Sequence, residues 1–134
     1  MSKKQIDQKI KNIIVGLKKL NFKSTDNVYI GIDLGKVFIN DYEKIFESNH
    51  LDLNQIRQYS IDKIIKNLKG FFKDGTIIVP SFNFDYFKER KFNKNFTRSS
   101  LGPFENSFIK KKGVSRSIIQ FFQFLHLVKI KIKY

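Results

Sequence analysis

The chain has 134 residues, a length that suits one domain able to bury a core of its own. It has no cysteine and only two histidines, His50 and His126, so disulfides, thiolate metal sites and histidine-rich metal clusters are excluded. No apolar run approaches the ~20 residues of a membrane span, and the basic N-terminus lacks the apolar core of a secretory signal. We therefore expect a cytoplasmic protein with no metal and no membrane partner.

The formal net charge is +14, from 26 Lys and Arg against 12 Asp and Glu. Such a balance is typical of nucleic-acid-binding proteins. The lysines, however, are scattered over every segment, and the abundant Lys, Asn, Ile and Phe all have codons made mostly of A and T. We attribute the charge to this composition, so nucleic acid is not the expected partner. A basic surface still suits a phosphorylated ligand.

Hydrophobic periodicity predicts the elements of the first half of the chain. These are a helix over 3–20, a strand over 27–35, a short helix over 40–47 and a second long helix over 53–68. The strand is predicted from the alternation of Val28, Ile30 and Ile32 ahead of a glycine. Asp33 and Asp85 lie at or just beyond strand ends, where open α/β sheets place their sites, but a lone Asp there is more often a turn or cap residue.

The second half begins with a turn at Asp74-Gly75 and a continuous apolar run, 76–79, which predicts a strand buried on both faces and ended by Pro80. A long loop is expected over 85–98. A third helix follows, with these signals: Ser99 or Ser100 as its cap, Pro103 in its first turn, Phe104 and Phe108 on one face, and Gly113 at its end. The order of elements indicates an α/β fold, a layered sheet flanked by helices.

The segments DGTIIVPSF and LGPFENSFIKKKGVSRS combine two motifs at a fixed spacing. The residues that carry them are Gly75-Thr76, Pro80-Ser81-Phe82, Leu101-Gly102, Phe108, Gly113 and Arg116-Ser117. In this order and spacing they resemble the aminoglycoside 3-N-acetyltransferase family. The resemblance covers residues 70–117 and implies that 1–117 is the incomplete N-terminal portion of a larger single-domain acetyltransferase fold.

The resemblance implies an acetyl-CoA-dependent N-acetyltransferase that modifies an amino group of an aminoglycoside or related aminosugar, an antibiotic-resistance activity. The partners would be coenzyme A and a small amine. The implied cofactor-binding residues are Asp33, Leu34, Ser81, Phe82, Arg116 and Ser117. An amine must lose a proton before it attacks a thioester, and the family carries the required general-base histidine well beyond its Arg-Ser pair. This chain has no such segment, so we assign no catalytic residue and expect an inactive fragment.

The chain also departs from the family pattern. Where the family has a Ser-Ser-Leu turn near coenzyme A, this chain has Ile32-Asp33-Leu34. A Gly-Gly pair that usually precedes the second helix is missing, and Glu105 stands one place earlier than is usual. These differences leave the acceptor amine open.

The C-terminal tail, 118–134, matches the family in a shifted reading frame. Codons permitted for residues 119–134, read from the third base of the first codon, give PIFSIFALGKNKNKI, with Pro, Ser, Ala, Gly and Lys where the family has them. We therefore predict that a frameshift near residue 118 made this tail. The alternative is a genuine strand pair, since KIKIKY alternates as a strand does.

Two other functions compete with the acetyltransferase. A small basic nucleic-acid-binding module would stack bases on exposed aromatic side chains, namely Phe82, Phe84, Tyr86, Phe87 and Phe92. A structural half-domain would instead pair with a partner chain through an exposed strand edge.

The frameshift predicts what the coding DNA contains. The nucleotides after the stop codon should encode the rest of an acetyltransferase in another frame, beginning with the histidine-containing segment. Sequencing that region tests the prediction, and the lack of any such open frame would contradict it.

Overall fold

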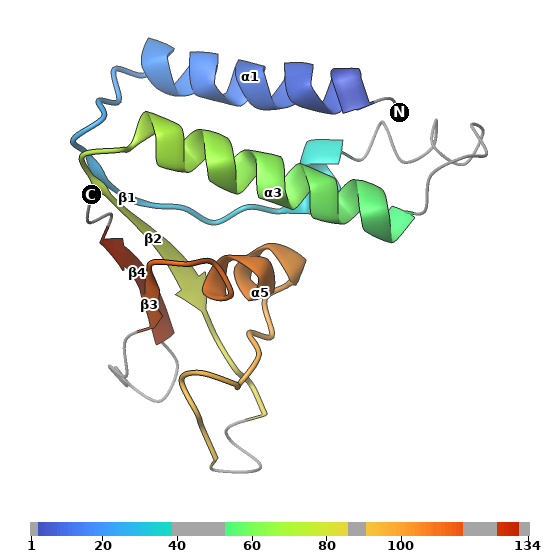
Figure 1. Ribbon diagram of the computed structural model, residues 1–134, viewed down its shortest axis with the longest axis vertical. Coiled ribbons are helices and arrows are strands. Elements are labelled where there is room, and N and C mark those ends of the chain that lie inside the picture. The colour runs from blue at the N-terminus through green and yellow to red at the C-terminus, as the bar shows by residue number, and fades with distance from the viewer. Residues whose placement is uncertain (1–2, 39–52, 86–90, 117–125, 132–134) are drawn as a thin grey trace. The chain divides into compact units, whose positions relative to one another are not determined.

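The computed structural model describes residues 3–38, 53–85, 91–116 and 126–131, the last of these by its backbone (Figure 1). The chain divides into two compact units. One comprises Met1–Ser24 and Ile32–Phe72, and the other comprises Thr25–Gly31 and Lys73–Tyr134. The described elements make a mixed α/β structure with an open sheet, so the predicted fold class is confirmed at this level. Among the described residues, no helix is long and apolar enough to cross a membrane.

The first unit is built on two long helices that lie side by side, α1 (Lys3–Lys19) and α3 (Leu53–Phe71) (Figure 1). Both confirm the predicted helices, and α3 continues three residues past the predicted end at Leu68. Their apolar faces are buried through Ile6, Ile10, Ile56, Ile61, Ile64, Ile65 and Leu68. This is the stripe that the 3.6-residue period of a helix creates.

A left-handed residue ends α1. Asn21 has φ 62°, its N–H donates to the carbonyl of Lys18, and the N–H of Phe22 donates to the carbonyl of Leu17. This pair of bonds is the Schellman arrangement, which satisfies carbonyls left over at a helix end. Asn adopts this conformation more readily than other non-glycine residues, so the polar stretch after residue 20 stops the helix.

A polar network also joins the two helices. The Tyr59 hydroxyl donates to Asp7 Oδ1 at 3.0 Å, and Lys63 Nζ lies 3.4 Å from the same oxygen. Lys63 Nζ also lies 5.2 Å from the centre of the Tyr59 ring. The pKa of Lys63 is raised, first by its hydrogen bond with Tyr59 and then by the charge of Asp7. Asp7 therefore fixes the register of α1 against α3 with one carboxylate.

The strand predicted over 27–35 is wrong beyond residue 29. Strand β1 comprises Asn27–Tyr29, and a helical stretch occupies residues 34–38. Asp33 starts that stretch, because its Oδ1 accepts the N–H of Lys36 at 3.2 Å and its carbonyl accepts the N–H of Val37 at 3.1 Å. A side-chain cap at Asp33 thus begins a helical stretch where the sequence predicted a strand. The helix predicted over 40–47 lies outside the described residues.

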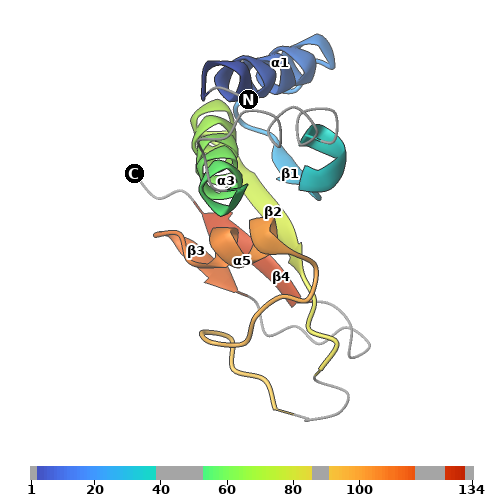
Figure 2. The same cartoon turned by 90° about the vertical axis from the view of Figure 1, so that its right-hand side faces the viewer.

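The second unit contains a four-stranded sheet with the order β1-β2-β4-β3 (Figure 2). Strand β2 (Thr76–Ser81) pairs parallel with β1 and antiparallel with β4 (His126–Lys131). Strand β3 (Val114–Arg116) pairs antiparallel with β4, and helix α5 (Pro103–Ile109) contacts β2 and β3. Phe104 and Phe108 lie on one face of α5 as predicted, and both are buried with their ring centres 5.9 Å apart.

Pro80 does not end β2, contrary to the sequence prediction. The strand continues to Ser81, and Pro80 is opposite Leu127 of β4. Ile78 accepts a hydrogen bond from Ile30 N, so residues 78 and 80 direct their backbone polar groups to the β1 side. At the level of Pro80, β1 has already ended, so the missing N–H of proline breaks no bond of the ladder. The predicted burial on both faces holds in part, because Ile77 and Val79 are fully buried and Thr76 and Ile78 are partly exposed.

The start of α5 also differs from the prediction. Its N-cap is Gly102, and neither Ser99 nor Ser100 caps it through a side chain. Asn106 instead holds the segment before the helix, because its Nδ2 donates to the carbonyls of Ser99 and Gly102 and its Oδ1 accepts the N–H of Ser99. Pro103 does occupy the first turn. Gly113 lies beyond the helix end, in the turn to β3, with φ 83°.

Part of the predicted out-of-frame tail, 118–134, forms β4, between β2 and β3. The first three residues of KIKIKY, 129–131, lie in this strand, and the rest lie outside the described residues. The pairing does not reveal the reading frame, because backbone hydrogen bonds of a sheet form with almost any side chain. The frameshift stays a prediction for the coding DNA.

Gly75 lies where two backbones approach closely. A Cβ added there would overlap the carbonyl oxygen of Asp26, just before β1, whereas one added at Gly16 in α1 would meet no atom within 4 Å. We expect Gly75→Ala to lower the free energy of unfolding by about 1–3 kcal/mol. Gly16→Ala should raise it by about 0.5–1 kcal/mol, because alanine favours a helix interior.

Chemical denaturation of the two variants beside the parent chain measures both effects. Equal stability of Gly75→Ala and the parent would contradict the close approach of residues 75 and 26.

Candidate functional site

Two residues of the family-like motifs meet in the second unit, at the ends of β2 and β3. Arg116 Nη2 donates to Ser81 Oγ at 2.6 Å, although 35 positions separate the two residues in the chain. Ser81 is fully buried and Arg116 is 9% exposed. The structure therefore brings together two of the six residues predicted to bind a cofactor.

The loop before α5 supplies two more contacts to the same guanidinium. Arg116 Nη1 donates to the carbonyl of Thr97 at 2.5 Å, and Arg116 Cζ lies 4.7 Å from the centre of the Phe92 ring. Sequence reasoning missed the role of Thr97 and assigned Phe92 to base stacking. No pattern in the sequence indicates these contacts, since they depend on the path of an irregular loop.

Hydrogen bonds hold the two ends of this loop together. Ser100 N donates to the carbonyl of Phe82 at 2.6 Å, and Asn83 Nδ2 donates to the carbonyl of Arg98 at 2.8 Å. Phe84 N donates to Ser100 Oγ at 3.1 Å. The segment after β2 therefore runs beside the segment before α5, which brings Thr97 and Phe92 to Arg116.

Burial changes the pKa values of two ionisable groups in this unit. Loss of solvent lowers the pKa of Arg116, whose hydrogen-bond acceptors are both uncharged. Its Nε is buried and has no hydrogen-bond partner among the described residues. Burial also raises the pKa of Glu105, and a bond from its own backbone N–H opposes this in part. Both groups thus lie in places where charge is costly.

The other predicted site residues have different surroundings. The Phe82 ring stacks on Phe84 with centres 6.5 Å apart and planes 9° apart. Asp33 and Leu34 belong to the first unit, where Asp33 caps residues 34–38 and Leu34 is buried. Ser117 lies outside the described residues.

An open hollow of about 330 Å³ lies beside Arg116. The loop contributes Lys94 and Asn95, α5 contributes Ile109, and β3 contributes Val114, Ser115 and Arg116. Among the residues that the structure describes, its lining carries two cations and no carboxylate. The hollow is large enough for part of a small molecule, since ligand sites span roughly 300–1,000 Å³.

Comparisons with models of known protein families, with curated proteins and with solved structures found no match to this chain. Within the described ranges, no three His, Asp or Glu side chains gather closely enough to hold a metal ion.

Ser81→Ala should destabilise the second unit, because it leaves Arg116 Nη2 buried without its acceptor. An unsatisfied buried group costs about 1–3 kcal/mol, and more when it is charged. Ser60→Ala is the matched control, since Ser60 is also buried but its hydroxyl donates to the carbonyl of Ile56, to which the helix already donates.

Urea unfolding of both variants measures the difference, and we expect Ser60→Ala to change stability by less than about 1 kcal/mol. Equal effects of the two substitutions would contradict a structural role for the Ser81–Arg116 bond.

Proposed function

We propose that the second unit of this chain binds acetyl-CoA, as part of an acetyl-CoA-dependent N-acetyltransferase that modifies an aminoglycoside or related aminosugar. One observation supports this proposal above the others. Ser81 and Arg116 belong to separate motifs of the acetyltransferase-like pattern, and they form a short, buried hydrogen bond. If the two motifs form one site, their residues should lie close together in the fold. A chance resemblance would not predict that Ser81 and Arg116 are in contact.

The residues near this bond have the chemistry that coenzyme A requires. Its phosphates carry negative charge, and Arg116 and Lys94 supply positive charge on one side of the loop. Phe82 presents a partly exposed aromatic surface at the end of β2. We assign cofactor contact to Phe82 and Arg116, whereas Ser81, which is fully buried, would act by holding the Arg116 guanidinium. Contact through Asp33, Leu34 and Ser117 stays a prediction.

Bound acetyl-CoA would supply an activated acetyl group to the amine. Transfer also requires a base that takes the proton of the amine, and the resemblance assigns no residue of this chain to that role. The proposal for this chain is therefore binding, while acetyl transfer belongs to the larger enzyme that the resemblance implies.

A small basic nucleic-acid-binding module remains the second candidate, and one observation favours it. Phe84 and Phe96 are 55% and 81% exposed, and the loop interleaves Phe96 with Lys91 and Lys94. Exposed aromatic rings among cations suit single-stranded nucleic acid. Phe92, in contrast, contacts Arg116, and Tyr86 and Phe87 lie outside the described residues.

Acetyl-CoA should raise the melting temperature of the purified chain. A ligand that binds only the folded state at a hundredfold excess over its Kd stabilises by about 2.7 kcal/mol. Ser81→Ala should reduce this gain relative to its own unliganded baseline. Tyr59→Phe, which removes a hydrogen bond in the first unit, should leave the gain unchanged.

The competing function predicts a different result. If a single-stranded oligonucleotide binds with a steep salt dependence while acetyl-CoA gives no shift, the nucleic-acid module is the better account. Acetylation of an aminoglycoside by this chain alone would contradict the assignment of transfer to the larger enzyme.

A further inference from the structure

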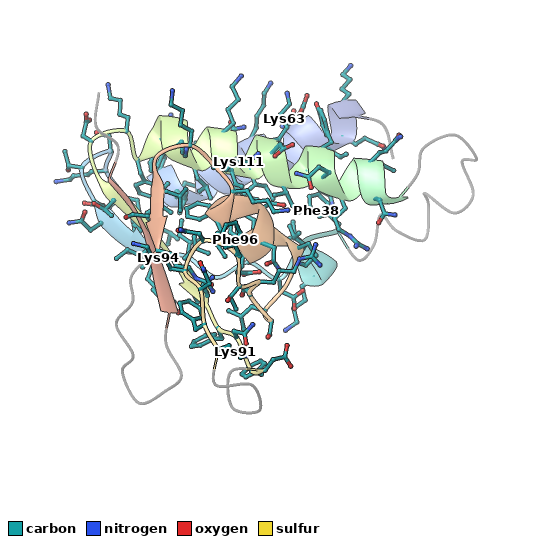
Figure 3. All side chains as sticks on the ribbon, turned by 60° about the horizontal axis from the view of Figure 1, so that its bottom comes forward. Phe38, Lys63, Lys91, Lys94, Phe96 and Lys111 are labelled. Atoms are coloured by element: carbon teal, nitrogen blue, oxygen red, sulfur yellow. The ribbon has the colours of Figure 1, made fainter. Side chains whose placement is uncertain are left out.

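The hollow beside β3 has an unbalanced charge. Lys94 and Arg116 line it, and no Asp or Glu of the described part of the chain does. Lys94 is exposed and comes from the loop, whereas Arg116 comes from the sheet and is 9% exposed. In Figure 3, Lys94 lies beside the strands, and Lys91 of the same loop lies farther out. The two cations of the hollow therefore reach it from independent elements.

The charge of Arg116 is not balanced within the described residues. Its acceptors among the described residues, Ser81 Oγ and the carbonyl of Thr97, are neutral, and its Nε has no hydrogen-bond partner there. No described carboxylate forms an ion pair with it. A buried guanidinium normally pairs with an anion, because neutral acceptors offset only part of the cost of removing a charge from water. The folded chain thus holds a cation that an incoming anion would stabilise.

The remaining walls indicate what kind of anion fits. Ser115 and Asn95 bring polar atoms to the hollow, and Ile109 and Val114 bring apolar surface. A bare inorganic ion would leave the apolar wall uncovered and most of the 330 Å³ unused. An organic phosphate uses both parts of the lining, since Arg and Lys are the usual phosphate binders and apolar side chains suit a carbon framework.

We propose that this hollow binds a small organic phosphate, with the phosphate group at Arg116 and Lys94 and the organic part against Ile109 and Val114. The inference depends on the hollow and not on acetyl transfer. Coenzyme A is one source of such a group, and a free nucleotide is another. The experiment below distinguishes the two.

Binding of ADP and of acetyl-CoA to the full chain is measured by isothermal titration calorimetry, together with S-acetylpantetheine, which has the organic arm but no phosphate. The test variant is Lys94→Glu, and the matched control is Lys91→Glu, an exposed lysine of the same loop that does not line the hollow. Both variants change the net charge equally, so they separate local contact from general attraction.

We expect Lys94→Glu to weaken the binding of a phosphate-containing ligand by about tenfold or more, as the loss of a charge-assisted contact would. Lys91→Glu should weaken it by less than about twofold, because an exposed charge far from the ligand is screened by salt. S-acetylpantetheine should bind less tightly than acetyl-CoA. Binding of acetyl-CoA without ADP identifies coenzyme A as the source, and comparable binding of both identifies a nucleotide phosphate site.

Three results would overturn the inference. One is equal loss of affinity in Lys94→Glu and Lys91→Glu, which would indicate attraction by overall charge. Another is the absence of binding by both ADP and acetyl-CoA, and the third is unchanged binding of acetyl-CoA in Lys94→Glu. The proposed function can fail separately: if ADP binds through Lys94 and acetyl-CoA does not bind at all, the phosphate site stands and the acetyltransferase proposal falls. If acetyl-CoA binds equally to the parent and to Lys94→Glu, the phosphate site falls and the acetyltransferase proposal stands.

Discussion

The second unit depends on one buried cation. The Arg116 guanidinium joins the end of β2, through Ser81, to the loop before α5, through Thr97 and Phe92. Ser81 belongs to β2, and Thr97 and Phe92 belong to the loop, so removing the guanidinium would remove these contacts between the loop and the sheet. An arginine suits this position because its planar group can donate in several directions while an aromatic ring covers its face. The same atoms that order the loop also form one wall of the hollow.

A buried charge that is bonded to neutral acceptors is an unusual way to hold a loop. An apolar side chain of similar size would fill the space without the cost of removing a charge from water. The hollow beside Arg116 offers a use for this charge besides stability, in line with the proposed phosphate site. Folding would position the cation in advance, so that an anion need not organise the site when it arrives. Preorganisation of this kind increases affinity because less freedom is lost on binding.

The first unit follows a simpler principle. Its helices pack through isoleucine and leucine side chains at helical spacing, and the Asp7 carboxylate, held by Tyr59 and Lys63, aligns them. Because these contacts repeat the sequence pattern, the pattern alone predicted both helices.

Local periodicity by itself determined the long helices, the apolar part of β2 and the paired phenylalanines of α5, because each depends on neighbours within a few residues. Local periodicity failed where contacts between residues distant in the sequence determine the structure. Pro80 stays in β2 because β1 has already ended beside it, and α5 begins at Gly102 without a side-chain cap from Ser99 or Ser100. For the site, the motif resemblance singled out Ser81 and Arg116, whereas Phe92, Lys94 and Thr97 join them only through the path of the loop. Spacing along a chain does not encode that path, because an irregular loop is positioned by contacts that form only once the sheet and α5 are in place.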